Sequence, residues 1–388
     1  MKNLSRRSFL KTGVIAGTTI LTSAGLAPRA IFSADGAPKI KYRDLGSTGF
    51  KVSEIGFGCM HNRDPELVHA GIDAGINFID TASEYMKGIN EEIIGQVMKT
   101  KRDRVFLSTK QMVKNGGNLL PMMEASLKRL QTDHVDMVMH HAVHKESDYA
   151  NDDLIRQFED VKRKGMARYI GISTHNPETI IRKVLEDKIW DGIEVACNYL
   201  SPQETLDAVR KAREAGIAVI AIKNILHYDT ETPLDADIRA EKTPGTTPEQ
   251  ALIRWVLNNP FIDTTCPGMT SFEHLADDLA VMNMDFTYDA EQLLRKHSQK
   301  FRNRYCYGFL GCQGCENQCP NGVSISEINR CLGYAFGYGD IELARENYRR
   351  IPRDRGIEPC ASCDRCMVKC VHGLDLASQM KTAGSLFL

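Results

Sequence analysis

Four residues of types that can move a proton stand before position 142 of the chain: Asp80, Tyr85, Lys110 and His141. A tyrosine hydroxyl has a pKa of about 10, so it is normally too weak an acid to protonate a carbonyl near neutrality. A lysine ammonium beside it favours the ionised form, and an aspartate keeps that lysine charged and in place. A histidine can donate a hydrogen bond to the same oxygen. Together the four suit proton delivery to an oxygen whose carbon receives a hydride.

A second group of chemically active residues lies near the C-terminus, where nine of the twelve cysteines crowd into residues 306–370. The later run has the spacing Cys-x2-Cys-x2-Cys-x3-Cys of bacterial ferredoxins, lacking only the Pro that follows Cys370. In two-cluster ferredoxins the fourth cysteine of each run ligates the other cluster. By that logic one [4Fe–4S] cluster is held by Cys306, Cys312, Cys315 and Cys370, and the other by Cys360, Cys363, Cys366 and Cys319. The irregular five-residue gap after Cys306 leaves one cluster as the alternative to two.

Two other uses of these cysteines stay open. Structural zinc commonly takes two Cys-x2-Cys pairs, although a triple run with a fourth cysteine suits a cubane better. Disulfides are an option for an exported protein with an even number of cysteines. The remaining cysteines, Cys59, Cys197, Cys266 and Cys331, are expected to be buried apolar residues.

Eight short apolar runs that read as buried parallel strands alternate with stretches of helical spacing between Lys39 and about Lys300. The expected strands are Glu54–Cys59, Asn77–Thr81, Val105–Lys110, Val135–His141, Arg168–Thr174, Gly192–Asn198, Ala218–Lys223 and Thr264–Gly268. Pro177 and Pro248 mark first helical turns. This pattern predicts an α/β fold, a (β/α)8 TIM barrel. The alternative fold, an open doubly wound sheet, requires a Gly-rich dinucleotide-binding loop after its first strand. The segment Gly56-Phe57-Gly58-Cys59 does not supply such a loop.

In such a barrel the strands end on one rim, and side chains far apart in sequence converge there. Asp80 closes the second expected strand, Lys110 the third, and His140 and His141 the fourth. Polar residues also close the later strands: Ser173 and Thr174, Asn198, and Lys223. One such residue is weak support, but four compatible ones on adjacent strands favour a catalytic site.

Several segments resemble those of the aldo-keto reductase family. Tyr42–Gly49 is similar to its opening hairpin, and Asp80–Tyr85, Ser108–Lys110 and Asp136–His141 are similar to its catalytic segments. Gly171–Asn176 is similar to its nicotinamide-contacting turn, and the resemblance covers residues 39–290. It implies hydride transfer between a nicotinamide cofactor, NAD(P)(H), and a carbonyl or alcohol, with Tyr85 as general acid. His141 rather than His140 fits the family spacing, and His140 is a departure that could add polarity to the site.

The cofactor side fits the family pattern less closely. The resemblance implies nicotinamide contacts at Ser173, Thr174, Glu194 and Lys223, and Glu194 replaces a glutamine that would touch the carboxamide. After the eighth strand, Gly268 and His274 stand where the family has a Lys and an Arg that bind the extra phosphate of NADP. Losing two cations that pair with a phosphate should cost several kcal/mol of discrimination. Dinucleotide binding is therefore expected without a clear preference for NADP.

The segment from residue 301 to 388 is expected to form a small α-helical ferredoxin-like domain after the barrel of 39–300. Ser324–Ala335 and Asp340–Arg349 read as helices between the two cysteine runs. Some relatives in the aldo-keto reductase family carry such a C-terminal module. Each cluster carries one electron whereas a nicotinamide gives up two as a hydride, and no flavin motif is visible. The clusters are therefore predicted to exchange electrons with a redox partner protein.

The first 35 residues read as a targeting segment. Ser5-Arg6-Arg7-Ser8-Phe9-Leu10-Lys11, followed by a mildly apolar run to Ala27, resembles a twin-arginine export signal. That route carries proteins already folded, often with a cofactor inside, so it permits clusters built before export. The expected location is periplasmic or extracytoplasmic. No clean cleavage site stands out between Ala24 and Ala37, so contact with a membrane through an uncleaved signal stays open.

The amino-acid composition limits which classes of molecule the chain can be expected to bind. The 388 residues include 49 basic and 50 acidic ones for a net charge of -1, so no basic excess exists to bind nucleic acid. The first hypothesis is an exported oxidoreductase acting on a small-molecule carbonyl or alcohol with a nicotinamide and two clusters. The alternative is an electron-transfer or ligand-binding protein whose barrel has lost carbonyl reduction.

Overall fold

The computed structural model describes residues 39–224, 246–301, 303–363 and 365–388. They divide into two compact units. Of the described residues, the first unit contains 39–141, 150–171 and 263–285, and the second contains 142–149, 172–224, 246–262, 286–301, 303–363 and 365–388. The expected signal segment and the loop His227–Thr243 lie outside the described residues.

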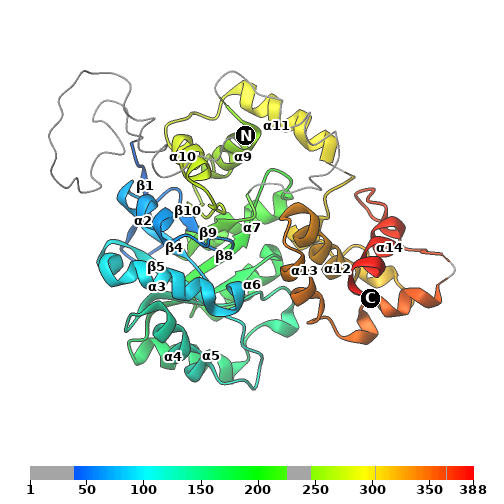
Figure 1. Cartoon of the computed structure of the whole chain (residues 1–388), viewed down its shortest axis with the longest axis horizontal. Coiled ribbons are helices and arrows are strands. Elements are labelled where there is room, and N and C mark those ends of the chain that lie inside the picture. Colours follow the sequence, from blue (N-terminus) through cyan, green and yellow to red (C-terminus); the bar gives the residue numbers. More distant parts are fainter. Residues whose placement is uncertain (1–38, 225–245, 302, 364) are drawn as a thin grey trace. The chain divides into compact units, whose positions relative to one another are not determined.

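The α/β fold is built on a curled parallel sheet of eight strands, in the order β10-β9-β8-β7-β6-β5-β4-β3 (Figure 1). The strands are β3 (Phe57–Gly58), β4 (Phe78–Asp80), β5 (Phe106–Gln111), β6 (Val135–His140), β7 (Ala167–Thr174), β8 (Gly192–Ala196), β9 (Ala218–Ile222) and β10 (Thr264–Thr265). The helices among and directly after them are α2 (Pro65–Asp73), α3 (Ile89–Lys101), α4 (Leu119–Leu130), α5 (Asp152–Arg163), α6 (Pro177–Asp187), α7 (Gln203–Glu214), α9 (Pro248–Leu257), α10 (Phe272–Val281) and α11 (Tyr288–Phe301). Each predicted strand is confirmed in place.

The two ends of this strand order meet in the first unit. Parallel bridges join Ile55 to Thr265 and Gly58 to Gly268. At Gly58 the two backbones approach so closely that a Cβ would lie 2.5 Å from the carbonyl oxygen of Pro267. Such joining of the first and last strands is what a closed sheet requires, and it is consistent with the predicted barrel.

Local signals in the sequence explain where the elements begin. The expected opening hairpin is present as β1 (Tyr42–Asp44) paired antiparallel with β2 (Lys51–Ser53). Pro177 and Pro248 both occupy first helical turns, as predicted. Thr247 caps α9 because its hydroxyl accepts a hydrogen bond from the backbone N–H of Gln250. The side-chain oxygen of Gln250 in turn accepts from the backbone N–H of Thr247.

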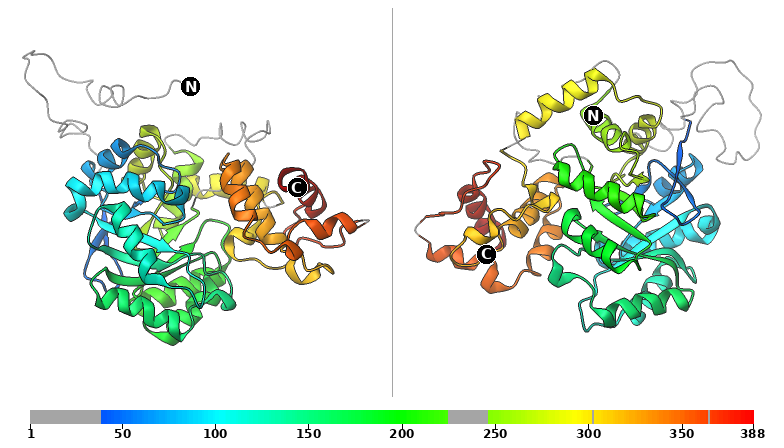
Figure 2. Two further views of the ribbon diagram at one scale, coloured as in Figure 1. Left: turned by 60° about the horizontal axis from the view of Figure 1, so that its bottom comes forward. Right: turned by 180° about the vertical axis from the view of Figure 1, so that it is seen from behind.

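The C-terminal part of the second unit is helical. It contains α12 (Ile325–Leu332), a π-helical turn (Gly333–Gly337), α13 (Ile341–Tyr348) and α14 (Leu376–Phe387). Figure 2 shows these helices, coloured from orange to dark red, gathered around one another. They share an apolar core that includes Ile328 and Ala383, both fully buried. Cys59, Cys197, Cys266 and Cys331 are buried, as expected. Among the described residues, no helix is both long enough and apolar enough to cross a membrane.

Candidate active site

Strands β4 and β5 bring Asp80 and Lys110 together in the first unit. Asp80 is aligned with Ser108, so Lys110, two residues further along β5, points to the same face of the sheet. The Nζ atom of Lys110 donates to Asp80 Oδ2 at 2.5 Å and to the carbonyl oxygen of Thr81 at 3.1 Å. The Lys110 side chain is 0% exposed. A buried ammonium is tolerated only when it is paired and hydrogen-bonded, and both conditions hold here.

Tyr85 also contacts Lys110, the residue that pairs with Asp80. Lys110 Nζ lies 3.3 Å from the Tyr85 hydroxyl and 5.1 Å from the centroid of its ring. Tyr85 opens a tight turn in which Met86 and Lys87 have φ values of 52° and 58°. Residues other than glycine rarely adopt this left-handed backbone conformation, so the turn that follows Tyr85 is strained.

His141 follows β6 and faces the same group. Its backbone N–H donates to the carbonyl of Gln111 at 2.9 Å, which extends the alignment of β5 with β6. Its ring lies edge-on to Tyr85, with centroids 5.8 Å apart. The structure therefore brings all four predicted catalytic residues together within one unit.

Glu84 is a member of this site that the sequence reasoning missed. Its Oε2 lies 2.9 Å from Nδ1 of His141. Burial alone would raise the pKa of Glu84, but hydrogen bonds from His141, Ser83 and the backbone of Met112 lower that pKa to about 2. The available signal was a carboxylate directly before Tyr85 in the catalytic segment.

His140 does not join the site, so the suggestion that it adds polarity there is wrong. Its Nε2 lies 2.9 Å from the carbonyl oxygen of Val113, and its ring contacts Phe158 of α5 at 5.7 Å between centroids. Burial lowers the pKa of His140 to about 4. Since successive side chains along a strand point to opposite faces of the sheet, His140 and His141 point in different directions.

Two of the predicted dinucleotide contacts lie in the first unit, next to the start of α10. A Cβ added at Gly268 would meet nothing within 4 Å, so the space beside it is open. His274 donates its backbone N–H to the capping hydroxyl of Ser271 at 3.1 Å, and its Nδ1 lies 3.1 Å from the Thr270 hydroxyl. Neither position supplies the permanent cation of the family pattern.

Three further predicted contacts, all buried, belong to the second unit. The Ser173 hydroxyl accepts from the backbone N–H of Ala142 at 3.0 Å, and the Thr174 hydroxyl accepts from that of Asn176 at 2.8 Å. Glu194 lies in β8, aligned with Ile220 of β9. The two hydroxyls thus hold the loop after β6 and the turn into α6.

Lys223, the last predicted contact, is engaged by the helical C-terminal part of the second unit. Its Nζ donates to the Tyr338 hydroxyl at 3.2 Å. It also lies over the rings of Tyr334 and Tyr338, 5.5 and 5.0 Å from their centroids. These two tyrosines were not foreseen, because nothing in their sequence context indicates a partner more than 100 residues away.

Comparisons with known proteins agree with the α/β fold described above. Residues 54–227 match the aldo/keto reductase family. The chain therefore carries an aldo/keto reductase domain. It is 26% identical over 311 residues to an uncharacterized oxidoreductase of Bacillus subtilis, YqkF, an alignment that covers 67% of this chain and 97% of the relative. The protein is accordingly an oxidoreductase of the aldo/keto reductase type.

Solved structures show the same fold. The holo form of the aldo-keto reductase AKR11C1 from Bacillus halodurans is 24% identical, with a TM-score of 0.57, over 66% of this chain and 96% of that one. An aldo-keto reductase from Klebsiella pneumoniae in complex with NADPH is 23% identical, with a TM-score of 0.56, over 66% of this chain and 95% of that one.

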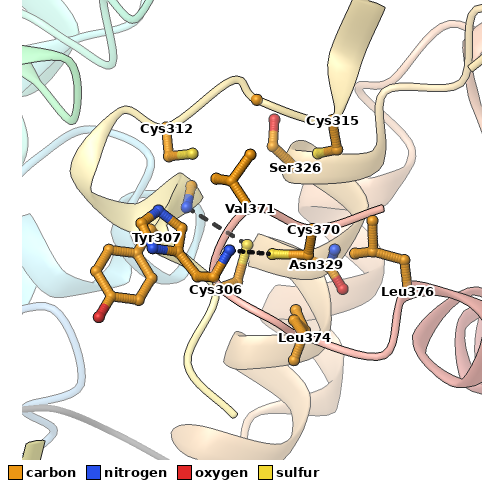
Figure 3. A pocket seen from close by; sticks show the side chains of 13 residues that line it. Cys306, Tyr307, Cys312, Cys315, Ser326, Asn329, Cys370, Val371, Leu374 and Leu376 are labelled. Carbon is orange, nitrogen blue, oxygen red and sulfur yellow. Dashed lines mark hydrogen bonds between the residues drawn. The ribbon is translucent and has the colours of Figure 1, made fainter. Parts of the chain in front are cut away.

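Beyond the aldo/keto reductase domain, four cysteines line one pocket of the helical part. Cys306, Cys312, Cys315 and Cys370 surround about 310 Å³ of empty space, open solvent included. Figure 3 shows the sulfur atoms of these cysteines turned toward this space. The backbone N–H groups of Gly308 and His372 donate to the sulfurs of Cys306 and Cys370, both at 3.4 Å. This set is the first one predicted from the ferredoxin-like spacing.

The other four cysteines form a second, more exposed set. Burial raises the pKa of Cys360 to about 11, with further contributions from Cys319, Cys363 and Cys366. Asn321 donates its amide N–H to the sulfur of Cys363 at 3.1 Å. Cys363 and Cys366 are exposed. The assignment of these four cysteines to a second cluster stays a prediction.

All twelve cysteines lie in the described part of the chain and are free thiols. Over the same residues, no three His, Cys, Asp or Glu side chains gather tightly enough to ligate a single metal ion. A structural zinc site requires four such ligands around one point.

Proposed function

We propose that the protein transfers a hydride between a nicotinamide dinucleotide and a small-molecule carbonyl or alcohol, with Asp80, Tyr85, Lys110 and His141 as its catalytic residues. The observation that carries this proposal is the fully buried Lys110, whose ammonium contacts both Asp80 and the Tyr85 hydroxyl. A buried cation at that distance stabilises the phenolate, so the hydroxyl gives up its proton more readily.

The residues divide the work as follows. The nicotinamide, when bound, supplies or accepts the hydride. Tyr85 gives a proton to the carbonyl oxygen during reduction, and takes one from the hydroxyl during alcohol oxidation. Asp80 keeps Lys110 charged, and Lys110 holds the Tyr85 hydroxyl ready to release its proton.

A dinucleotide is supported by the family and by the relative from Klebsiella pneumoniae, which was solved in complex with NADPH. The open space beside Gly268 and the start of α10 suit a phosphate, because the first backbone N–H groups of a helix favour anions. Ser173, Thr174, Glu194 and Lys223 are the proposed nicotinamide-side contacts. With Gly268 and His274 in place of two cations, we propose little preference for NADP over NAD.

The two cysteine sets are proposed to hold two [4Fe–4S] clusters, each of which carries one electron when bound. Burial, helped by the three neighbouring cysteines of its set, raises the pKa of Cys306 to about 12. Burial likewise raises the pKa of Cys315 to about 12. Such thiols resist ionisation unless a cationic centre compensates them, as iron does. The N–H donors to Cys306, Cys370 and Cys363 suit thiolate sulfurs. Residues 301–388 would then be a ferredoxin-like domain after a barrel of 39–300.

A redox partner protein is proposed to dock at the second cysteine set. Cys363 and Cys366 are exposed, and the neighbouring Met367 is 61% exposed. A small apolar rim of this kind suits the brief encounters of electron-transfer proteins, which bury little surface.

Export is proposed from the resemblance of Ser5–Lys11 to a twin-arginine signal. The protein would then act in the periplasm or another extracytoplasmic space, with clusters and dinucleotide loaded before export. Free dinucleotide is scarce outside the cytoplasm, so retention of the cofactor during turnover is part of this proposal.

The test is transfer of deuterium from [4-²H]NADPH and [4-²H]NADH to 4-nitrobenzaldehyde, butanone and D-glyceraldehyde. The wild type is expected to place deuterium on the carbinol carbon of at least one product. Tyr85→Phe should lower kcat by roughly 10²–10⁴-fold, because it removes the proton donor. The control is Tyr288→Phe, whose ring is 76% exposed and lies in α11.

Dinucleotide binding without deuterium in any product would defeat this proposal. It would support the alternative, an electron-transfer or ligand-binding protein whose barrel no longer reduces carbonyls.

A further inference from the structure

Lys223 is a proposed nicotinamide-side contact, and tyrosines of the cysteine-rich helical part surround it. We propose that Tyr338 is a positioning residue for the nicotinamide side of the dinucleotide site, because it fixes the ammonium of Lys223 before the dinucleotide binds. The inference rests on the proposed function and extends the dinucleotide site beyond the residues 54–227 that match the family. Lys223 and its tyrosines all belong to the second unit.

The backbone of Lys223 is strained. Lys223 directly follows β9, and its φ of 58° lies in the left-handed region that residues other than glycine rarely adopt. A glycine would adopt this backbone without strain, so the chain carries a lysine side chain here at a cost in stability. Strain of this kind gathers at functional sites. The strained backbone therefore indicates that the side chain of Lys223 has a use.

Asn198, which follows β8, fixes this backbone. Its side-chain N–H donates to the carbonyl oxygen of Lys223 at 2.9 Å, and Asn198 is fully buried. The same side chain is hydrogen-bonded to the hydroxyl of Tyr305, which is also buried. An amide group has two N–H donors, so it can serve both partners. Asn198 thus connects the backbone of Lys223 to the segment that carries Cys306.

The side chain of Lys223 is fixed at its far end by two tyrosines of the π-helical turn and the residue after it. Its Nζ donates to the Tyr338 hydroxyl at 3.2 Å and lies 5.0 Å from the centroid of that ring. It also lies 5.5 Å from the centroid of the Tyr334 ring. Ring faces attract a cation, so both rings add to the hydrogen bond. The ammonium is therefore held at one place.

The partner of Lys223 leaves the charge of the ammonium uncancelled. Burial raises the pKa of Tyr338, so its hydroxyl stays protonated and neutral. A carboxylate at the same place would form an ion pair and neutralise the lysine. An ammonium also has three N–H donors, of which the bond to Tyr338 uses one. Lys223 can thus donate to an electronegative group of the dinucleotide while Tyr338 holds it.

Fixing the ammonium in advance strengthens binding. Lysine has a flexible four-carbon side chain, and a ligand that has to immobilise such a side chain binds more weakly. A lysine that is already held avoids most of this loss. The tyrosine hydroxyl, although it need not touch the dinucleotide, therefore raises the affinity through Lys223.

The first experiment measures the dissociation constants of NADPH and NADH for full-length protein freed of bound dinucleotide. Tyr338→Phe keeps the ring over Lys223 and removes the hydroxyl, so it should raise both constants roughly fivefold. Lys223→Met should raise them about tenfold or more, because it removes the charged donor itself. The control is Tyr288→Phe, whose ring is 76% exposed in α11 and which should leave both constants unchanged.

The double variant separates positioning from general damage. If Tyr338 acts through Lys223, adding Tyr338→Phe to Lys223→Met should have no further effect on either constant. A loss that persists in the Lys223→Met background would overturn the inference, and so would unchanged constants in Tyr338→Phe alone.

ADP-ribose, which lacks the nicotinamide, tests the side of the site. Tyr338→Phe should leave the dissociation constant of ADP-ribose unchanged, and a loss equal to that for NADH would overturn the nicotinamide-side inference. The proposed function fails separately if these differences in binding are found but no deuterium reaches any product. A wild type that binds neither dinucleotide would overturn both.

Discussion

At the scale of single residues, the site depends on polar groups that are buried in hydrogen-bonded pairs. Lys110 is fully buried against Asp80, and Glu84 lies against His141. Removing one member of a buried ion pair leaves the other charge uncompensated, which commonly lowers the free energy of unfolding by roughly 3–5 kcal/mol. The catalytic groups therefore contribute to each other's position as well as to the chemistry. Glu84 shows why such pairing is hard to predict, because its partner lies 57 residues further along the chain.

One prediction at this scale concerns the choice of dinucleotide. Replacing His274 by Arg should raise the affinity for NADPH relative to NADH by about tenfold or more, since hydrogen bonds to a charged group contribute about 1.5–3 kcal/mol. Dissociation constants for both dinucleotides, measured by protein fluorescence at low salt, give the ratio. An unchanged ratio would mean that the phosphate does not bind at the start of α10.

At the scale of elements, the closing of the sheet depends on a close backbone approach. Gly58→Ala would place a Cβ 2.5 Å from the carbonyl oxygen of Pro267 and 2.8 Å from that of Cys266. Backbone atoms of a bridged strand cannot yield easily, so we expect a loss of stability of about 1–3 kcal/mol. The matched control is Gly268→Ala on the partner strand, where a Cβ would meet nothing within 4 Å.

Urea unfolding of the two variants and the wild type measures this difference. Equal midpoints for Gly58→Ala and Gly268→Ala would contradict the proposed role of the close approach.

The elements were largely predictable because apolar periodicity records burial, and a strand buried on both faces reads as a short apolar run. Proline at a first helical turn was equally informative, as Pro177 and Pro248 show. The four catalytic candidates could be found because parallel strands end on a common rim. The contact of Lys223 with Tyr338 could not, since it depends on how the C-terminal helices pack against β9. His140 was misjudged because strand ends give no sign of which side chain turns inward.

At the scale of the molecule, contacts within the second unit join the cysteine-rich helices to loops that follow strands of the sheet. Lys145, after β6, pairs with Glu327 of α12 at 2.9 Å. Gly311 approaches the backbone of His175, after β7, so closely that a Cβ would lie 2.8 Å from its carbonyl oxygen. Lys223, after β9, contacts Tyr338. These three contacts, all within the second unit, join the cysteine-rich helical part to loops of the aldo/keto reductase domain.

The central claim is that carbonyl chemistry and two clusters with exchanged fourth ligands share this chain. Its most direct test is the iron and sulfide content of full-length protein purified without air, with an electron paramagnetic resonance spectrum after dithionite. We expect about eight irons and eight sulfides per chain. Cys315→Ser and Cys370→Ser should alter one cubane signal, and Cys363→Ser and Cys319→Ser the other. Zinc, no metal, or a Cys370→Ser variant that alters the same signal as Cys363→Ser would contradict the account.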